Sequence, residues 1–202
     1  MSMAPRPDVS QERRNQIIAA AIAVFTRLGF HEARIEDIAK EAKLSKGALY
    51  WYFKSKDDII AAIMDHFIGR EIVELEEALK LQAPISEKLM KLNGMIVDEM
   101  QSMLDLMPIL YEFYAAATRR KDVRKALLQY FRPTQQLLSR LIQQGLESGE
   151  FAPVDAEVVA VDFIALYEGL LLLAVLDPKT IDLKKMGAHG VNLMIEGLKV
   201  KS

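Results

Sequence analysis

The spacing of apolar residues predicts helices along the chain and gives no strand pattern. In the segment from Ser10 to about Leu28, apolar residues return at steps of three and four, which is the period of one helix face. These residues are Ile17, Ala21, Val24, Phe25 and Leu28. Gly29 is placed to end the helix, because glycine readily takes the left-handed conformation that often follows a last turn.

Two short helices are predicted next. The first covers Ile35–Ala42 and has Glu36 and Asp37 in its first turn, where the helix dipole favours negative charge. Ser45 is a good N-cap for the second, because its hydroxyl can accept a hydrogen bond from a free N–H of the first turn. Two short helices joined by three or four residues form a helix-turn-helix, and the helix before them would brace it.

The second of these helices lies within Leu44–Lys56, LSKGALYWYFKSK, and has an unusual surface. At about 100° per residue its positions divide into two arcs. One arc holds Lys46, Gly47, Tyr50 and Trp51, and the other holds Ala48, Leu49, Tyr52 and Phe53. Two large aromatic residues beside a cation and a glycine suit a surface that enters a groove, so we interpret this segment as a DNA recognition helix.

The remaining sequence predicts a larger helical body. A long fourth helix begins at Ser55, with Asp58 three residues later as in a capping box. Five more helices are expected at about residues 85–104, 107–118, 122–149, 155–176 and 182–199, the third of them capped by Asp122. The predicted fold is all-α, with about nine helices: a flexible arm (1–9), a helix-turn-helix DNA-binding domain (10–56) and a helical effector-binding and dimerisation domain (57–202).

The distribution of charge changes the picture at one end of the chain. The 202 residues have a formal net charge of −2, but residues 1–56 carry ten Lys and Arg against six Asp and Glu, and the remainder carries sixteen against twenty-two. A basic end on an acidic body is expected when one end of a protein meets phosphate groups.

Several classes of site are disfavoured by composition. The chain has no cysteine, which excludes disulfides, zinc–cysteine sites and thiol nucleophiles. His31, His66 and His189 are scattered without metal-ligand spacing, and no phosphate loop or nucleophile elbow is present. We therefore expect no metal, no cofactor and no enzymatic activity.

A cytoplasmic location is expected from two further features. The first residues have no apolar core and do not form a signal peptide. The most apolar window, Val158–Leu176, contains Asp162 and Glu168, so a buried helix fits it better than a membrane span.

The segment from Arg14 to Ile60 resembles the N-terminal DNA-binding domain of the TetR family of bacterial transcriptional regulators. The match covers about a quarter of the chain and rests on ordered motifs: Gly29-Phe30, Ile38-Ala39, Ser45-Lys46-Gly47, Leu49-Tyr50, Tyr52-Phe53 and Lys54-Ser55-Lys56. Two positions depart from the family pattern. Arg34 stands where a threonine or serine usually introduces the second helix, and Lys43 replaces the glycine that is common in the turn.

The resemblance and the side-chain chemistry together give a predicted DNA-binding set. It comprises Arg34, Ile35, Ser45, Lys46, Gly47, Tyr50, Trp51, Tyr52 and Lys56. Gly47 allows a helix N-terminus to approach a phosphate, and Trp51 can lie against sugars or a thymine methyl group. Arg34 either contacts DNA directly or is a solvated arginine.

Methionine and aromatic residues predict an effector pocket in the body. The expected lining is Met100, Met103, Met107, Tyr111, Glu112, Tyr114, Phe131, Phe163, Tyr167 and Glu168. Such residues make deformable, largely apolar walls, with the two glutamates as candidate polar anchors. For any single residue, ordinary core is the commoner role, and for the glutamates the alternative is a solvated or interfacial carboxylate.

The last two predicted helices carry a candidate dimer interface. Its residues are Ala165, Gly169, Leu172, Leu176, Gly187, Gly190, Val191 and Met194. The resemblance implies a two-fold four-helix interface here, whereas packing within a single chain is the alternative.

These expectations combine into a function. The leading hypothesis is a homodimeric repressor that binds operator DNA and is released by a largely hydrophobic small-molecule effector, with no membrane partner. The alternative is a DNA-binding dimer that is independent of ligand or is gated by a protein partner.

Overall fold

The computed structural model describes residues 9–200, without the side chains of residues 9, 31, 66–71, 74, 122 and 130. Residues 1–8 of the predicted arm lie outside this range. The described chain forms nine α-helices and one short 3-10 helix, and the all-α prediction is confirmed. The elements are α1 (Val9–Glu32), α2 (Ile35–Glu41), α3 (Lys46–Tyr52), α4 (Lys56–Lys80), α5 (Ile85–Met103), η1 (Leu104–Leu106), α6 (Met107–Ala117), α7 (Lys121–Glu147), α8 (Ala156–Leu176) and α9 (Leu183–Leu198).

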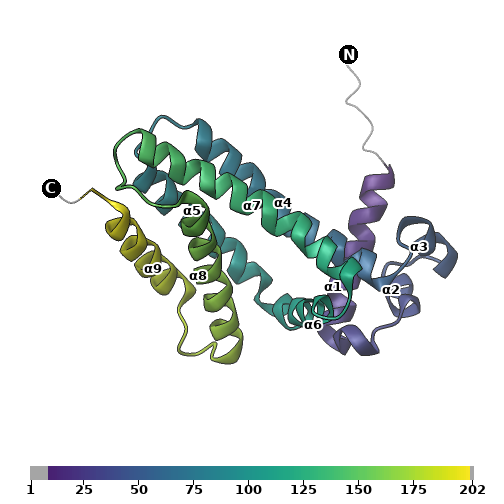
Figure 1. The fold of residues 1–202 in the computed structure, drawn as a ribbon. Helices are drawn as coiled ribbons and strands as arrows, with labels where there is room; N and C mark the ends of the chain where they lie inside the picture. The colour runs from purple at the N-terminus through teal and green to yellow at the C-terminus, as the bar shows by residue number, and fades with distance from the viewer. Residues whose placement is uncertain (1–8, 201–202) are drawn as a thin grey trace, which may run out of the picture.

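Helices α1, α2 and α3 form the helix-turn-helix at one end of an elongated molecule (Figure 1). Gly29 has a φ of 77° and interrupts α1 at the predicted place, although a further helical turn continues to Glu32. Ser45 caps α3, because its hydroxyl oxygen accepts a hydrogen bond from the Ala48 N–H at 3.1 Å.

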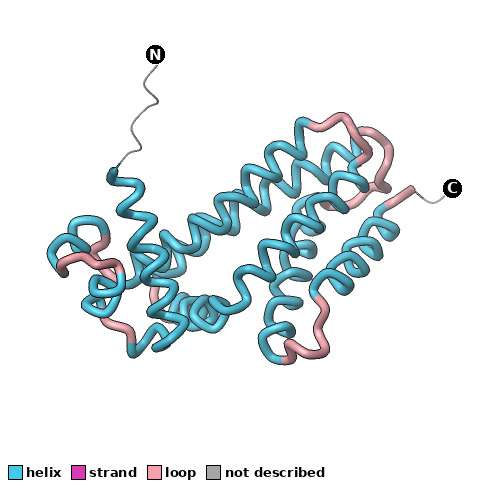
Figure 2. The backbone as a smooth tube through the Cα atoms, turned by 180° about the vertical axis from the view of Figure 1, so that it is seen from behind, coloured by secondary structure: helices cyan, strands magenta, loops and turns pink. Residues whose placement is uncertain are grey.

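The core of the helix-turn-helix continues into the body. Ile17, Phe25 and Leu49 belong to the same buried cluster as Met107 and Leu110 of α6. The helix-turn-helix therefore packs directly on α4 and α6 and is not separated from the body by a linker. Helices α4 and α7 run alongside each other through the length of the molecule, as the views from both sides show (Figures 1 and 2).

The far end of the body is closed by the turn after α7. Glu150 in this turn accepts hydrogen bonds from the backbone N–H groups of Ile85 (2.6 Å) and Ser86 (2.8 Å), and so satisfies free donors at the start of α5. Gly145 is required beneath the Phe151 ring, because a Cβ at this position would overlap that ring. The prediction that Asp122 caps α7 is wrong: the helix begins at Lys121, and Arg120 takes the cap position.

Candidate functional site

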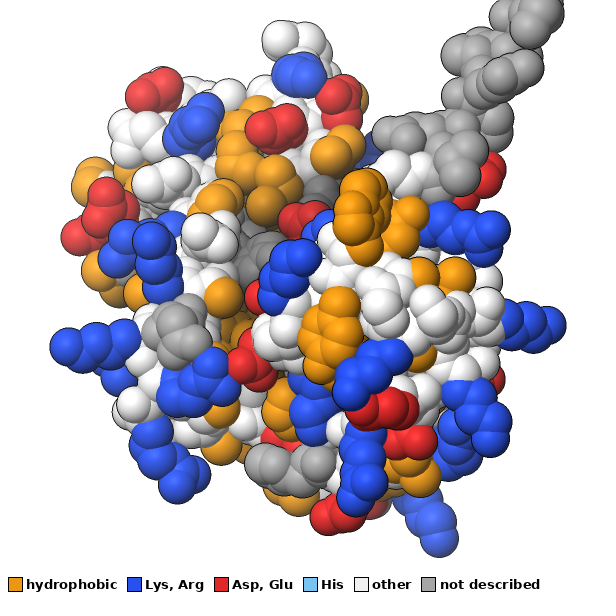
Figure 3. All heavy atoms as spheres, turned by 90° about the vertical axis from the view of Figure 1, so that its right-hand side faces the viewer, with side chains coloured by type: hydrophobic (Ala, Val, Ile, Leu, Met, Phe, Trp, Pro, Cys, Tyr) orange, Lys and Arg blue, Asp and Glu red, His pale blue; other side chains and the backbone are white. Residues whose placement is uncertain are grey.

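The exposed face of α3 has the predicted composition. Ser45, Lys46, Gly47, Tyr50 and Trp51 are all exposed, and 70% of Trp51 is accessible to solvent. The opposite side of α3 is anchored by buried residues, including Leu49 and Phe53. Figure 3 shows that the end of the molecule formed by these helices carries many Lys and Arg side chains around exposed hydrophobic ones. A surface of this kind can face a phosphate backbone and present apolar rings to a groove.

Lys46 is paired within the protein. Its ammonium forms an ion pair with Glu36 of α2, a residue absent from the predicted set. The hydrogen bond between the two groups lowers the pKa of the Glu36 carboxyl and raises the pKa of Lys46. Because both side chains are more than half exposed, DNA phosphates can compete for Lys46, and Glu36 then becomes an acceptor at the same surface.

Two members of the predicted DNA-binding set do not present their side chains to DNA. Ile35 is buried in the core of the helix-turn-helix, so its side chain is unavailable. Lys56 donates to the carbonyl oxygens of Phe30 (2.6 Å) and Ala33 (2.8 Å), and its ammonium lies 4.6 Å from the centroid of the Phe30 ring. Lys56 therefore ties the start of α4 to the segment between α1 and α2.

The two departures from the family pattern have visible consequences. Arg34 is exposed at the N-cap of α2, and its backbone N–H donates to Asp37 Oδ2 at 3.0 Å. The Asp37 N–H, which a hydroxyl cap would bind, donates to the Arg34 backbone carbonyl at 3.1 Å instead. Lys43 has a φ of 54° and is the single non-glycine residue with positive φ in the described chain. This left-handed conformation explains why glycine is common at the position.

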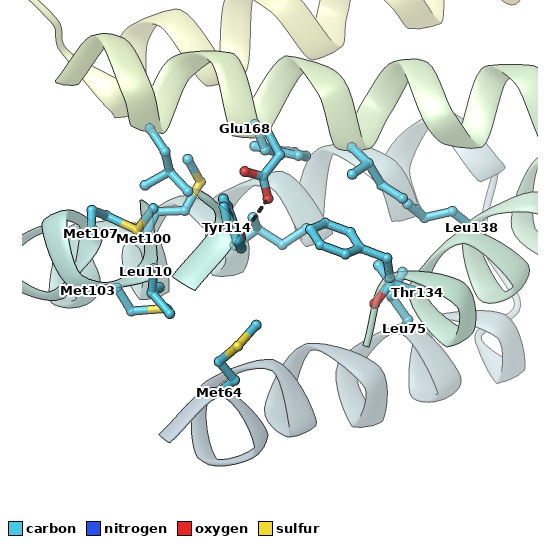
Figure 4. A pocket seen from close by; sticks show the side chains of 15 residues that line it. Met64, Leu75, Met100, Met103, Met107, Leu110, Tyr114, Thr134, Leu138 and Glu168 are labelled. Atoms are coloured by element: carbon cyan, nitrogen blue, oxygen red, sulfur yellow. Dashed lines mark hydrogen bonds between the residues drawn. The ribbon is translucent and has the colours of Figure 1, made fainter. Parts of the chain in front are cut away.

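A cavity of about 100 Å³ lies inside the body, between α4, α5, α6, α7 and α8. Seven of the ten predicted effector residues line it: Met100, Met103, Met107, Tyr114, Phe131, Tyr167 and Glu168. The other lining residues, outside the predicted set, are Met64, Leu75, Ile96, Leu110, Thr134, Leu138, Ile164 and Leu171. Figure 4 shows Met64 pointing into this space from α4 and Glu168 pointing into it from α8.

Three predicted effector residues do not line the cavity. Phe163 is buried in the cluster formed with α5, α7 and α9. Tyr111 and Glu112 precede the lining residue Tyr114 on α6 but are not part of the wall. The breadth of the apolar stripe on α4 was the available signal for Met64, since a stripe that wide must pack on more than one partner.

Glu168 gives the cavity its polar end. Its Oε1 accepts a hydrogen bond from Tyr114 Oη at 3.5 Å, and burial raises the pKa of the Glu168 carboxyl despite this bond. The Tyr111 hydroxyl is buried and has no hydrogen-bond partner in the described part of the chain. Burial, with a contribution from the Glu168 charge, raises the pKa of Tyr111 to about 12.

One face of α8 is apolar and exposed. It comprises Val158, Val161, Ala165, Gly169, Leu172, Leu173 and Leu176, and 70% of Leu176 is accessible. Asp162 is also exposed on this side, between Val158 and Ala165. By length and composition α8 could also cross a membrane. Its other faces pack against α7 and α9 and line the cavity, however, so a core helix with one uncovered face explains the composition.

The predicted interface residues of α9 pack within the same chain in this structure. A Cβ at Gly187 would lie 2.9 Å from Val97 of α5, and one at Gly190 would lie 3.0 Å from Leu166 of α8. Val191 is buried in the core and Met194 packs against it. The outward face of α9 instead carries Leu193, which periodicity alone could not separate from the inward face.

Comparison with known proteins places both parts of the chain. Residues 17–63 match the family described as "Bacterial regulatory proteins, tetR family", and residues 86–195, more than half of the chain, match "BetI-type transcriptional repressor, C-terminal". YfiR of Bacillus subtilis (strain 168), described as an uncharacterized HTH-type transcriptional regulator, is 28% identical over 173 residues. The match covers 82% of this chain and 83% of that protein.

Two solved structures show the same fold along almost the whole chain. The complex of SmeT, the repressor of the Stenotrophomonas maltophilia multidrug efflux pump SmeDEF, with triclosan has a TM-score of 0.82 at 22% identity, covering 95% of this chain and 94% of SmeT. FadR from Bacillus subtilis in complex with stearoyl-CoA has a TM-score of 0.73 at 22% identity, covering 91% of this chain and 98% of FadR. The chain belongs to the TetR family of DNA-binding transcriptional regulators, a non-enzymatic family, and carries a BetI-type C-terminal domain.

Proposed function

We propose that this protein is a homodimeric repressor that a small, largely apolar effector releases from its operator. The observation that carries the proposal is that the cavity wall and the core of the DNA-binding domain share residues. Met64, Met107 and Leu110 line the cavity and also lie in the buried cluster that holds α1, α2 and α3 together. An effector that repacks these side chains therefore acts directly on the core of the DNA-binding domain.

The start of α4 supplies the second part of the coupling. Lys56 binds α4 to the segment between α1 and α2, and Asp57 forms an ion pair with Arg120, at the start of α7, at 2.7 Å. A shift of α4 or α7 at the cavity thus reaches the helix-turn-helix through packed elements. The effector changes DNA affinity only if it binds the DNA-free arrangement more tightly than the DNA-bound one.

The exposed face of α8 supports the dimer. An uncovered apolar stripe over the length of a helix is unusual on a monomer and is typical of an interaction surface. Pairing this face with itself about a two-fold axis would give the molecule two recognition helices. To bind adjacent major grooves, the two recognition helices must lie about 34–36 Å apart. The effector would act by changing this distance.

The relatives agree with this proposal. Similar folds hold triclosan in SmeT and stearoyl-CoA in FadR. Triclosan is largely apolar, and stearoyl-CoA carries a long apolar acyl chain on its charged coenzyme A. The cavity also favours this proposal over a ligand-independent DNA-binding dimer, for which a filled interior would be expected. As a DNA-binding regulator the protein would act in the cytoplasm.

The test starts with selection of bound sequences from random DNA, which supplies an operator. Tyr50→Ala should then abolish specific binding in fluorescence anisotropy, while circular dichroism and thermal unfolding remain those of the native protein, because Tyr50 is exposed. Triclosan, as a hydrophobic probe, should lower the DNA affinity of the native protein. Unchanged binding by Tyr50→Ala would place the recognition site elsewhere, and DNA affinity that no hydrophobic ligand alters would refute release by an effector.

A further inference from the structure

The described wall of the cavity carries charge of one sign. All the described lining residues except Glu168 are uncharged, and neither lysine, arginine nor histidine is among them. A carboxylate in such a wall loses hydration and needs compensation from hydrogen bonds or from an opposite charge. Glu168 therefore makes this cavity suited to one sign of ligand.

Among the described residues, Glu168 has little compensation for its charge. The Tyr114 hydroxyl donates to Glu168 Oε1 over 3.5 Å, which is long compared with the usual 2.5–3.0 Å for an O–H···O bond. The buried hydroxyl of Tyr111 has no hydrogen-bond partner in the described chain, and its titration responds to the charge of Glu168. The Glu168 carboxylate therefore has acceptor capacity that the described residues leave unused.

Aromatic rings surround the same end. Tyr114 and Phe131 both line the cavity, with ring centroids 6.2 Å apart, and Tyr167 lies one position before Glu168 on α8. Aromatic faces attract cations, and the effect is stronger where water is excluded. The methionines of the other walls are flexible enough to accommodate an apolar chain or ring.

We propose that the effector is a lipophilic cation, an amine or ammonium with an apolar body, whose charged nitrogen lies against Glu168 among these rings. This inference rests on the proposed function, because it takes the cavity as the effector site. It also separates this protein from a sensor of fatty acids. A carboxylate ligand would be repelled by Glu168, and the described wall residues include no cation to offset that repulsion.

The experiment uses three probes that share one chain: octylammonium, 1-octanol and octanoate. Each is titrated into the full-length, DNA-free protein by isothermal titration calorimetry at neutral pH. Octylammonium should bind about tenfold more tightly than octanol, because it alone can form an ion pair with Glu168. A tenfold difference corresponds to roughly 1.4 kcal/mol, a size expected for a hydrogen-bonded ion pair. Octanoate should bind more weakly than octanol.

Two variants assign the preference to Glu168. Glu168→Gln keeps the shape of the side chain and should bring the affinities for octylammonium and octanol within about twofold of each other, since the charge term is removed. Glu157→Gln makes the same change at an exposed position of α8 and should keep the tenfold preference. The comparison uses the ratio of two ligands within each protein, so a change in overall stability does not imitate the result.

The outcomes separate this inference from the proposed function. Equal affinity of the native protein for octylammonium and octanol, tighter binding of octanoate, an unchanged ratio in Glu168→Gln, or no binding of any probe would each overturn the inference. Loss of DNA binding on adding octylammonium is measured independently by anisotropy. A cation preference without DNA release would keep the inference and refute effector-controlled repression.

Discussion

At the residue scale, the turn of the helix-turn-helix contains one strained position. Lys43 holds a φ of 54°, a conformation that costs a residue with a Cβ about 1 kcal/mol relative to glycine. The turn forces this conformation, because the N–H groups of Lys43 and Leu44 must still reach the carbonyl oxygens of Lys40 (3.0 Å) and Ala39 (2.8 Å). Unlike glycine, Lys43 adds a positive charge beside the DNA-facing surface.

Lys43→Gly should therefore stabilise the protein by about 1 kcal/mol, as measured by urea unfolding at constant slope. The matched control is Lys40→Gly, an exposed lysine within α2, which should destabilise by about 1 kcal/mol because glycine weakens a helix interior. A loss of stability in both variants would show that the turn imposes no strain at Lys43.

Local chemistry explains why several residues could be predicted from the sequence. The side chains of Ser45, Ser55, Asp155 and Asp182 each accept a hydrogen bond from an N–H in the first turn of the helix that follows. These bonds join atoms two or three residues apart, so the sequence contains both partners. Lys56 could not be assigned in the same way, because its acceptors lie 26 and 23 residues earlier and depend on the tertiary fold.

At the scale of elements, α4 is held to the DNA-binding domain by more than apolar packing. The Lys56 ammonium satisfies two backbone carbonyl groups in a partly buried site, and the ring of Phe30 lies beneath it. Removing the ammonium leaves both carbonyl groups without this donor. Hydrogen bonds to a charged group contribute about 1.5–3 kcal/mol to the free energy of unfolding, and this contribution would be lost.

Lys56→Met should lower the free energy of unfolding by about 2 kcal/mol, as measured by urea unfolding. The salt dependence of operator binding should stay unchanged, because Lys56 makes its contacts within the protein.

Arg34→Ala is the contrasting variant, since Arg34 is exposed at the same surface. If Arg34 contacts a phosphate, its loss should reduce the magnitude of the salt slope by about 0.9. If Lys56→Met had native stability but a reduced salt dependence of operator binding, Lys56 would belong to the DNA-contacting set after all. If the salt dependence of Arg34→Ala were unchanged, Arg34 would be a solvated arginine.

Helix periodicity predicted which residues share a face, but not which neighbour covers that face. Gly187 and Gly190 share a face of α9, and in the structure that face packs closely on Val97 and Leu166 of the same chain. The cavity shows the same limit, because Met64 enters it from a helix whose apolar stripe is broad enough for two partners. Choosing between such partners requires the positions of all the helices.

At the scale of the molecule, the charged and apolar surfaces lie on different parts. The basic, aromatic surface belongs to α2 and α3 at one end, and the apolar exposed face belongs to α8 in the body (Figures 1 and 3). The DNA-contacting surface and the proposed dimer surface therefore do not overlap. Only the interior, where α4 and α6 meet the cavity, is common to both parts.

The dimer proposal can be tested with two matched leucines. Leu172 lies on the exposed face of α8 and is 44% accessible, whereas Leu128 on α7 is 37% accessible and lies outside that face. Leu172→Glu should weaken self-association about 100-fold or more, roughly 3 kcal/mol, because a two-fold axis buries the new carboxylate twice. Leu128→Glu should leave it unchanged in sedimentation velocity at micromolar concentration. A monomeric native protein, or a Leu172→Glu dimer as tight as the native one, would move the interface away from α8.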